Sequence, residues 1–203
     1  MLIDSHTHLQ FPQFDKDRDE VIKRALDNAI WLVNVGADKE SSIKAVALAN
    51  KYKEGVYATV GVHPHDAGKD FSYDFFKKLA LEPKVVAIGE CGLDYYRFKI
   101  EDLRFKKRQQ EVFIKHIELA KELNKPLMIH CRDAFPDLIE ILNSEFLILN
   151  SPPGVVHFFT GTLDDAKKLL EMGFYFTFGG LITFNRSFDE IIKFLPLEKI
   201  KER

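Results

Sequence analysis

His6 and His8 are separated by one residue at the end of the apolar run that opens the sequence. In a β-strand, side chains two positions apart point to the same side, so both imidazoles would face one point. Imidazole is the commonest metal ligand among protein side chains, and two rings on a rigid strand are preorganised for one ion. The pair is therefore a candidate metal motif, although a lone His-x-His is equally typical of a surface pair.

The same arrangement recurs at three later points of the sequence. Glu90, His130 and His157 each end a mostly apolar run of three to five residues. Four apolar runs that all end in a potential ligand are hard to explain as ordinary core residues, so the sequence predicts one metal site. Its expected ligands are His6, His8, Glu90, His130 and His157.

The expected cofactor is a divalent cation, and Glu90, which supplies the carboxylate, is the expected catalytic residue. Imidazole nitrogens fix the geometry of such a site, and the carboxylate adds negative charge. The cation lowers the pKa of water and neutralises phosphate oxygens in a transition state. On ligand softness alone, mixed imidazole and carboxylate ligands suit manganese or zinc better than magnesium.

The elements that must position these residues are short apolar runs that alternate with longer amphipathic stretches. Continuous apolar runs are typical of parallel strands that are covered on both faces. Seven strands are predicted, at residues 2–8, 29–35, 56–62, 85–90, 126–130, 155–159 and 174–178. Helices are predicted between and after them, at residues 17–28, 41–52, 73–80, 103–123, 136–142, 163–172 and 188–194.

Uninterrupted alternation of strands and helices predicts an α/β fold with a parallel sheet, and we expect residues 1–203 to form a single domain. The ligand candidates all fall at the carboxyl ends of strands. That edge carries the active site in a TIM-like (β/α)₈ barrel, whereas a doubly wound open sheet would place its ligand near one switch point. Ligands from the first, fourth, fifth and sixth strands converge more naturally in a barrel.

Composition limits the expected partners and location. The 29 Lys and Arg residues nearly balance the 31 Asp and Glu residues, so the net charge of −2 offers no general attraction to a polyanion. Cys91 and Cys131 directly follow ligand candidates, so strand alternation should turn both thiols away from the metal, and buried free thiols are expected. No signal peptide or membrane span is visible, so we expect a cytoplasmic protein without a membrane partner.

Five motifs together resemble the TatD-type metal-dependent deoxyribonucleases of the amidohydrolase superfamily. The matching segments cover nearly the whole chain in order: Asp4-Ser5-His6-Thr7-His8, Gly61-Val62-His63-Pro64-His65, Gly89-Glu90-Cys91-Gly92-Leu93-Asp94-Tyr95, Ile129-His130-Cys131-Arg132-Asp133-Ala134 and His157-Phe158-Phe159-Thr160-Gly161. The resemblance implies a distorted (β/α)₈ barrel, one or two divalent cations, commonly magnesium, and hydrolysis of DNA phosphodiesters. Matching by motif gives the same five metal ligands.

The resemblance also implies an Asp ligand after an eighth strand, and this Asp has no counterpart in the 203 residues. Residues 195–200 resemble a loop that leads into that strand. The barrel is therefore expected to lack its eighth strand in this chain and to be C-terminally incomplete, with impaired catalysis. The alternative is that Asp4 or Asp94 replaces the missing carboxylate and a partner chain covers the gap.

Two further residues are expected to bind substrate. His63, just past the third strand, would donate to a substrate phosphate, unless Pro64 simply sets a surface turn there. Arg132 would form a bidentate contact with phosphate, and the equally weighted alternative is a salt bridge to Asp133 or to a neighbouring carboxylate. Asp94 would either orient a ligand or cap a turn.

Residues 97–108 contain six basic residues against two acidic ones and follow two tyrosines. Basic and aromatic groups together suit a nucleic-acid strand, although a solvated start of a helix explains the charges equally well. The expected partner is therefore a DNA or oligonucleotide substrate, hydrolysed at its phosphodiester bonds. The alternatives are hydrolysis of a cyclic amide or ester and an inactive binding remnant; the oligomeric state stays open.

Overall fold

The computed structural model of the protein describes residues 2–68, 71–96, 103–145 and 153–200. Within these ranges, strands and helices alternate along the chain as the sequence predicts. All seven predicted strands form and join in one parallel sheet. They are β1 (Leu2–Thr7), β2 (Ile30–Val35), β3 (Val56–Val60), β4 (Val85–Asp94), β5 (Leu127–Arg132), β6 (Gly154–His157) and β7 (Tyr175–Phe176).

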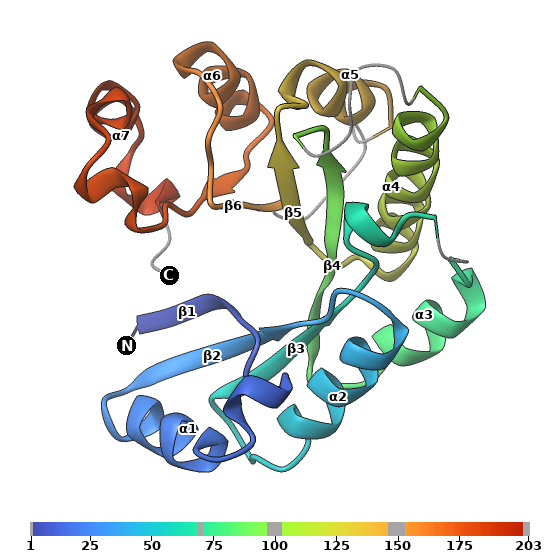
Figure 1. Ribbon diagram of the computed structural model, residues 1–203, viewed down its shortest axis with the longest axis vertical. Coiled ribbons are helices and arrows are strands. Elements are labelled where there is room, and N and C mark those ends of the chain that lie inside the picture. The colour runs from blue at the N-terminus through green and yellow to red at the C-terminus, as the bar shows by residue number, and fades with distance from the viewer. Residues whose placement is uncertain (1, 69–70, 97–102, 146–152, 201–203) are drawn as a thin grey trace.

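The sheet curls, so that its first and last strands approach each other while the helices lie outside it (Figure 1). Its strand order runs from β1 to β7 without a reversal. A doubly wound sheet requires such a reversal, so that alternative is wrong. The fold is a TIM-like half-barrel of the α/β class, and its described residues contain seven of the strands expected for a closed barrel.

The seven predicted helices also form, and they differ from the expected ranges by a few residues at their ends. A capping box at Asp38 starts α2, and a second one at Thr162 starts α6. The helices are α1 (Arg18–Asp27), α2 (Lys39–Ala49), α3 (Tyr73–Ala80), α4 (Leu103–Leu123), α5 (Phe135–Glu145), α6 (Leu163–Glu171) and α7 (Asp189–Phe194). Among the described residues, no helix is long and apolar enough to cross a membrane.

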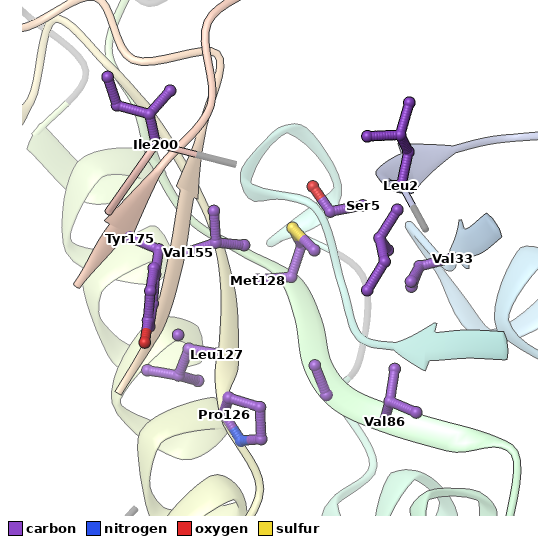
Figure 2. A pocket seen from close by; sticks show the side chains of 13 residues that line it. Leu2, Ser5, Val33, Val86, Pro126, Leu127, Met128, Val155, Tyr175 and Ile200 are labelled. Carbon is purple, nitrogen blue, oxygen red and sulfur yellow. The ribbon is translucent and has the colours of Figure 1, made fainter. Parts of the chain in front are cut away.

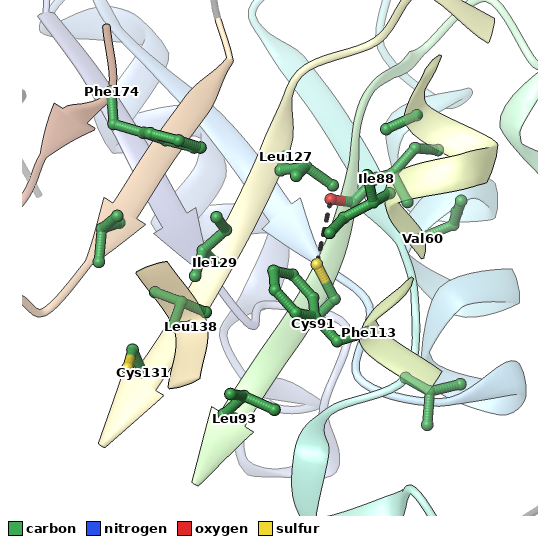
Figure 3. Close-up of a cluster of buried hydrophobic side chains, with 14 of the residues drawn as sticks. Val60, Ile88, Cys91, Leu93, Phe113, Leu127, Ile129, Cys131, Leu138 and Phe174 are labelled. Carbon is green, nitrogen blue, oxygen red and sulfur yellow. Dashed lines mark hydrogen bonds between the residues drawn. The ribbon is translucent and has the colours of Figure 1, made fainter. Parts of the chain in front are cut away.

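The main core lies between the outer face of the sheet and the helices. Figure 3 shows Ile88 and Leu93 of β4 packed with Phe113 of α4, and all three are fully buried. Cys91 and Cys131 belong to this same cluster as buried free thiols, which confirms that they turn away from the predicted metal site. This layer fixes the strands and therefore the direction of the residues at their carboxyl ends.

The inner face of the curled sheet is open near the amino ends of the strands. A cavity of about 510 Å³ lies there, and Figure 2 shows Leu2 and Val33 on one side of it and Val155 and Tyr175 on the other. Ile200 lines the same cavity and forms a single parallel bridge with Phe176 of β7. The segment 195–200, predicted to lead into an eighth strand, thus ends beside β7. The expectation of impaired catalysis stays a prediction.

Five of the strands differ from their predicted lengths by one or two residues, and β4 and β7 differ most. β4 continues four residues past Glu90 to Asp94, and its register with β5 shifts between Ile88 and Cys91. Gly92 permits this continuation, because its φ of +130° and its close approach to a β5 carbonyl exclude a side chain. β7 keeps only two residues of its predicted five, because the chain after Phe176 leaves the sheet and runs into short 3₁₀ turns.

Candidate metal centre

The structure brings all five predicted metal ligands together around the carboxylate of Glu90. They come from the carboxyl ends of four strands or from the residue that follows, as expected for a TIM-like fold. Glu90 is 4% exposed. The distances to its oxygens are 3.5 Å from His6 Nε2, 3.8 Å from His8 Nε2, 3.2 Å from His130 Nδ1 and 2.8 Å from His157 Nε2.

A sixth residue joins this centre, because His63 Nε2 lies 3.5 Å from Glu90 Oε1. Its backbone N–H donates to Ala37, and its Nδ1 accepts from the backbone of His65, so the ring is held with Nε2 toward the carboxylate. Pro64 does begin a 3₁₀ turn here, as the alternative supposed, but the His63 ring that caps this turn also faces Glu90. The signal was available in the sequence, since His63 follows the apolar run 56–62 in the same way as the other ligand candidates.

The two oxygens of Glu90 face two different groups of imidazoles. Oε2 lies beside His6 and His8, whereas Oε1 lies beside His63, His130 and His157. Two sets of donor atoms lie within 4.8 Å of one another, His6 with His8 and Glu90, and His63 with Glu90 and His130. A carboxylate shared in this way can serve two neighbouring cations at once.

His6 and His8 are aimed by the backbone around β1. The ring nitrogen Nδ1 of His8 lies 2.9 Å from the Val35 carbonyl, and this contact turns Nε2 toward Glu90. Thr7, between the two histidines, points the other way and bonds to the backbone and side chain of β2. The strand alternation predicted from the His-x-His spacing is thus confirmed.

Asp94 orients the opposite side of the centre. Its Oδ2 accepts from His130 Nε2 at 2.9 Å, so the other ring nitrogen of His130 faces Glu90. His65 Nε2 also lies 2.8 Å from this oxygen, while Oδ1 accepts from the backbone N–H of Tyr96. Asp94 therefore fulfils both roles that the sequence left open, orienting a ring and capping a turn.

The protonation states of the centre follow from burial and mutual contact. Burial alone would raise the pKa of Glu90, but His157, His130 and His6 outweigh it and hold this pKa well below its usual range. Burial, reinforced by His6, lowers the pKa of His157 to about 3, and burial lowers that of His63 to about 4. An ionised carboxylate and neutral imidazoles are the forms that bind metal ions.

His130 behaves differently from its neighbours. Burial would lower its pKa, but the hydrogen bonds to Asp94 and Glu90 outweigh this and raise the pKa to about 9. The metal-free centre therefore holds a proton on His130 near neutral pH. A cation that binds to this ring must displace that proton, as is general for metal binding to titratable ligands.

The donor set fits a divalent cation. A single buried carboxylate among several imidazoles matches the nitrogen and oxygen ligands that zinc and manganese prefer. Within the described chain, the buried Nδ1 atoms of His6 and His157 have no hydrogen-bond partner. Buried polar atoms normally have a hydrogen-bond partner. The protein's own hydrogen bonds therefore do not account for the burial of these two nitrogens.

The centre lies in a cavity of about 610 Å³ with an apolar wall. Arg132 lines this cavity, and its guanidinium carbon lies 3.4 Å from the centre of the Tyr96 ring. Among the described residues no ion pair joins Arg132 to Asp133, and the guanidinium instead lies over the Tyr96 ring. Phe11, Phe158 and Leu181 supply apolar surface to the same cavity; Phe158 lies in a predicted motif, whereas no sequence motif includes Phe11 or Leu181.

The predicted basic segment is only partly described, because residues 97–102 lie outside the described ranges. Arg104 and Lys107 are exposed on the first turns of α4, and Lys106 lies 4.3 Å from the ring centre of Tyr95. Arg108 instead turns to the protein, where it donates to the Ala67 carbonyl. Three of the basic side chains thus remain candidates for a polyanionic ligand.

Comparison with known proteins identifies the family. The family model described as TatD related DNase matches residues 3–200. This chain belongs to the TatD family. Among its relatives, the uncharacterized metal-dependent hydrolase YabD of Bacillus subtilis is 39% identical, with 98% of this chain and 78% of YabD covered. The 3'-5' ssDNA/RNA exonuclease TatD of Cronobacter sakazakii is 38% identical, with 97% of this chain and 73% of that protein covered.

A solved TatD structure agrees with the fold. The TatD homologue YJJV of Escherichia coli K12 superposes with a TM-score of 0.86 at 30% identity, over 98% of this chain and 76% of that one. The family resemblance inferred from the motifs is confirmed, and the protein is a TatD-family metal-dependent hydrolase. The chain spans about three quarters of the length of these relatives.

Proposed function

We propose that this TatD-family hydrolase cleaves phosphodiester bonds of single-stranded nucleic acid with the help of one or two divalent cations. The observation that carries the proposal is one buried carboxylate, Glu90, with separate groups of imidazoles at its two oxygens. The name of the Cronobacter relative, a 3'-5' ssDNA/RNA exonuclease, supports nucleic acid as the substrate class. The proposed ligands are His6, His8, His63, Glu90, His130 and His157.

The residues of the centre have distinct roles in this proposal. When bound, a divalent cation supplies a lowered pKa for the attacking water and offsets charge on the phosphate oxygens. Glu90 would supply negative charge that attracts cations to the buried site, and each of its two oxygens faces a separate group of imidazoles that could hold one. Asp94 holds the His130 ring in one orientation, so that the ring does not reorganise during the reaction.

Arg132 and His63 differ in their fit to the predicted substrate role. Arg132 lines the cavity with a planar guanidinium that can hold a phosphate through two parallel hydrogen bonds. His63 lies within the donor group around Glu90, which favours a metal ligand over the phosphate donor predicted from sequence. The phosphate would accordingly lie on the Arg132 side of the centre.

The types of the proposed ligands also predict which cations bind most tightly. Magnesium prefers octahedral oxygen ligands and keeps several waters, whereas imidazole nitrogens suit manganese and zinc. Six proposed ligands include five imidazoles, so we expect stronger binding of manganese or zinc than of magnesium. Elemental analysis of the protein after dialysis against each ion measures this order.

The decisive experiment combines metal content with nucleotide release from a 5'-labelled single-stranded oligonucleotide. Glu90→Gln should lower both by at least about a hundredfold, because the amide removes the negative charge that both groups of imidazoles share. Glu140→Gln, an exposed change on α5, is the matched control and should change neither. Full metal content and activity in Glu90→Gln would refute the site, and cleavage of a cyclic amide without any nucleic-acid cleavage would refute the substrate class.

A further inference from the structure

We propose that Phe158 is the platform on which a nucleobase stacks beside the phosphate that is cleaved. This inference rests on the proposed function and adds a residue that recognises the substrate. Phe158 directly follows His157, whose ring nitrogen lies 2.8 Å from Glu90, and it lines the same cavity as the metal centre. Phe158 is therefore adjacent in sequence to a proposed metal ligand and shares its cavity.

Phe158 and its neighbour Phe159 have different surroundings. Phe159 is 2% exposed and packs edge-on against Phe135 and Phe176 in the core. Phe158 is only half-buried and is not among the described residues that pack on the core cluster. A large aromatic ring in the wall of a reaction cavity, partly accessible and beside the metal centre, has the position of a ligand contact.

The backbone at Phe158 adopts a conformation that bulky residues rarely take. Its φ is +47°, in the left-handed region that favours glycine. Thr177, which is fully buried, holds this turn through its hydroxyl, which accepts from the Phe158 N–H at 3.0 Å, and its carbonyl accepts from the Phe159 N–H. Such conformations persist only where the surroundings enforce them, and they concentrate at functional sites.

Gly179 provides the space for the ring. A Cβ on this residue would lie 1.9 Å from Cε2 and 2.3 Å from Cδ2 of Phe158, closer than atoms can approach. The φ of Gly179 is −87°, a value that any residue adopts, so the backbone itself does not require glycine here. The Phe158 ring occupies the space that a side chain at residue 179 would need, which explains the glycine. Gly179 in turn allows the Phe158 ring to lie against the backbone.

The chemistry of this wall matches a base of a single strand. Aromatic side chains bind bases through their flat faces and tolerate every sequence, because each base has a π-face. Arg132 in the same cavity offers the positive charge for the adjoining phosphate. A base in a duplex is already stacked and paired, so this wall favours single-stranded substrate.

The test measures binding separately from catalysis. A phosphorothioate oligonucleotide that resists cleavage carries 2-aminopurine at its terminal position, and its fluorescence falls when the base stacks on an aromatic ring. Base stacking on one aromatic side chain corresponds to a loss of roughly 5- to 150-fold in affinity when it is removed. Phe158→Leu in the metal-loaded protein should show this loss and no quenching, whereas Phe158→Trp should retain both.

Three comparisons separate recognition from a structural role. An oligonucleotide that is abasic at the terminal position should bind wild type and Phe158→Leu equally. Gly179→Ala should weaken binding as much as Phe158→Leu, and the double variant should be no worse than Phe158→Leu alone, because the clash disappears with the ring. Phe194→Leu, a partly exposed change on α7, is the control and should bind like wild type.

The outcomes distinguish this inference from the proposed function. If wild type cleaves the oligonucleotide but Phe158→Leu binds it as tightly, the stacking platform is refuted and the nuclease proposal stands. An equal loss on the abasic oligonucleotide would show that Phe158 only supports the fold and would also refute the platform. If wild type neither binds nor cleaves any oligonucleotide with manganese, zinc or magnesium, both proposals fall.

Discussion

His116 is a buried histidine whose neutral form is required by the fold. It lies in the middle of α4, is fully buried, and its Nε2 accepts from the Val62 N–H at 2.9 Å while its Nδ1 donates to the Val112 carbonyl at 2.7 Å. The ring of Phe71 packs against it at 4.6 Å. Protonation of Nε2 would remove the acceptor for Val62 and place a charge in an apolar environment.

The magnitude follows from the pKa of this residue. Burial lowers the pKa of His116 from 6.5 to about 4, although the hydrogen bond to Val112 opposes this. Between these two values the unfolded chain binds a proton that the folded protein does not, so stability falls as the pH falls. At about 1.4 kcal/mol for each tenfold difference in proton affinity, the full effect is roughly 3 kcal/mol, of which about 2 kcal/mol is lost between pH 7.5 and pH 5.

The prediction is tested with His116→Gln, in which the side-chain carbonyl can still accept from Val62 but does not titrate. Urea unfolding of the metal-free wild type and variant, at about pH 7.5 and about pH 5, gives the free energy of unfolding of each. Other groups titrate in both proteins and cancel in the comparison. The wild type should lose about 2 kcal/mol more than the variant over this range.

A second variant tests the hydrogen bond itself. His116→Leu leaves the buried Val62 N–H without its acceptor and should cost a further 1–3 kcal/mol, roughly, at both pH values. If wild type and His116→Gln lose the same stability between the two pH values, the buried neutral histidine is not the source of the pH dependence. The reasoning from burial to proton affinity would then be refuted.

Two further predictions concern the substrate and the sheet. Replacing Arg104, Lys106 and Lys107 by Gln should weaken oligonucleotide binding without changing metal content, and the salt dependence of binding should fall by up to about 2 in log–log slope, since each phosphate contact contributes about 0.7. If binding in the variant is unchanged and independent of salt, these three side chains do not contact the substrate and the segment is only the solvated start of a helix. Gly92→Ala should destabilise the protein by at least about 2 kcal/mol in urea unfolding. The new Cβ would lie 2.0 Å from a β5 carbonyl oxygen, and the φ of residue 92 is +130°. Gly180→Ala, with open space around it, is the control.

The elements of the fold could be predicted because their local patterns agree with the tertiary structure. Every predicted strand is a short, mostly apolar run. In the parallel sheet the outer face of such a run packs under the helices, and its inner face lines the interior of the curled sheet. The lengths of β4 and β7 could not be predicted. β4 reaches Asp94 only because Gly92 passes close to the neighbouring strand, and that approach depends on residues about forty positions away.

The candidate site shows the same division. The sequence by itself determined that His6, His8, Glu90, His130 and His157 lie at one edge, because side-chain alternation and parallel pairing follow from local rules. The sequence also offered His63 and Asp94 as candidates, but only the tertiary structure decided that His63 faces Glu90 and that His130 is the ring that Asp94 orients. It also decided that Phe158 lines the cavity over Gly179. These contacts depend on how loops from separate strands approach one another, and loop directions are set by packing across the whole barrel edge, which no local pattern records.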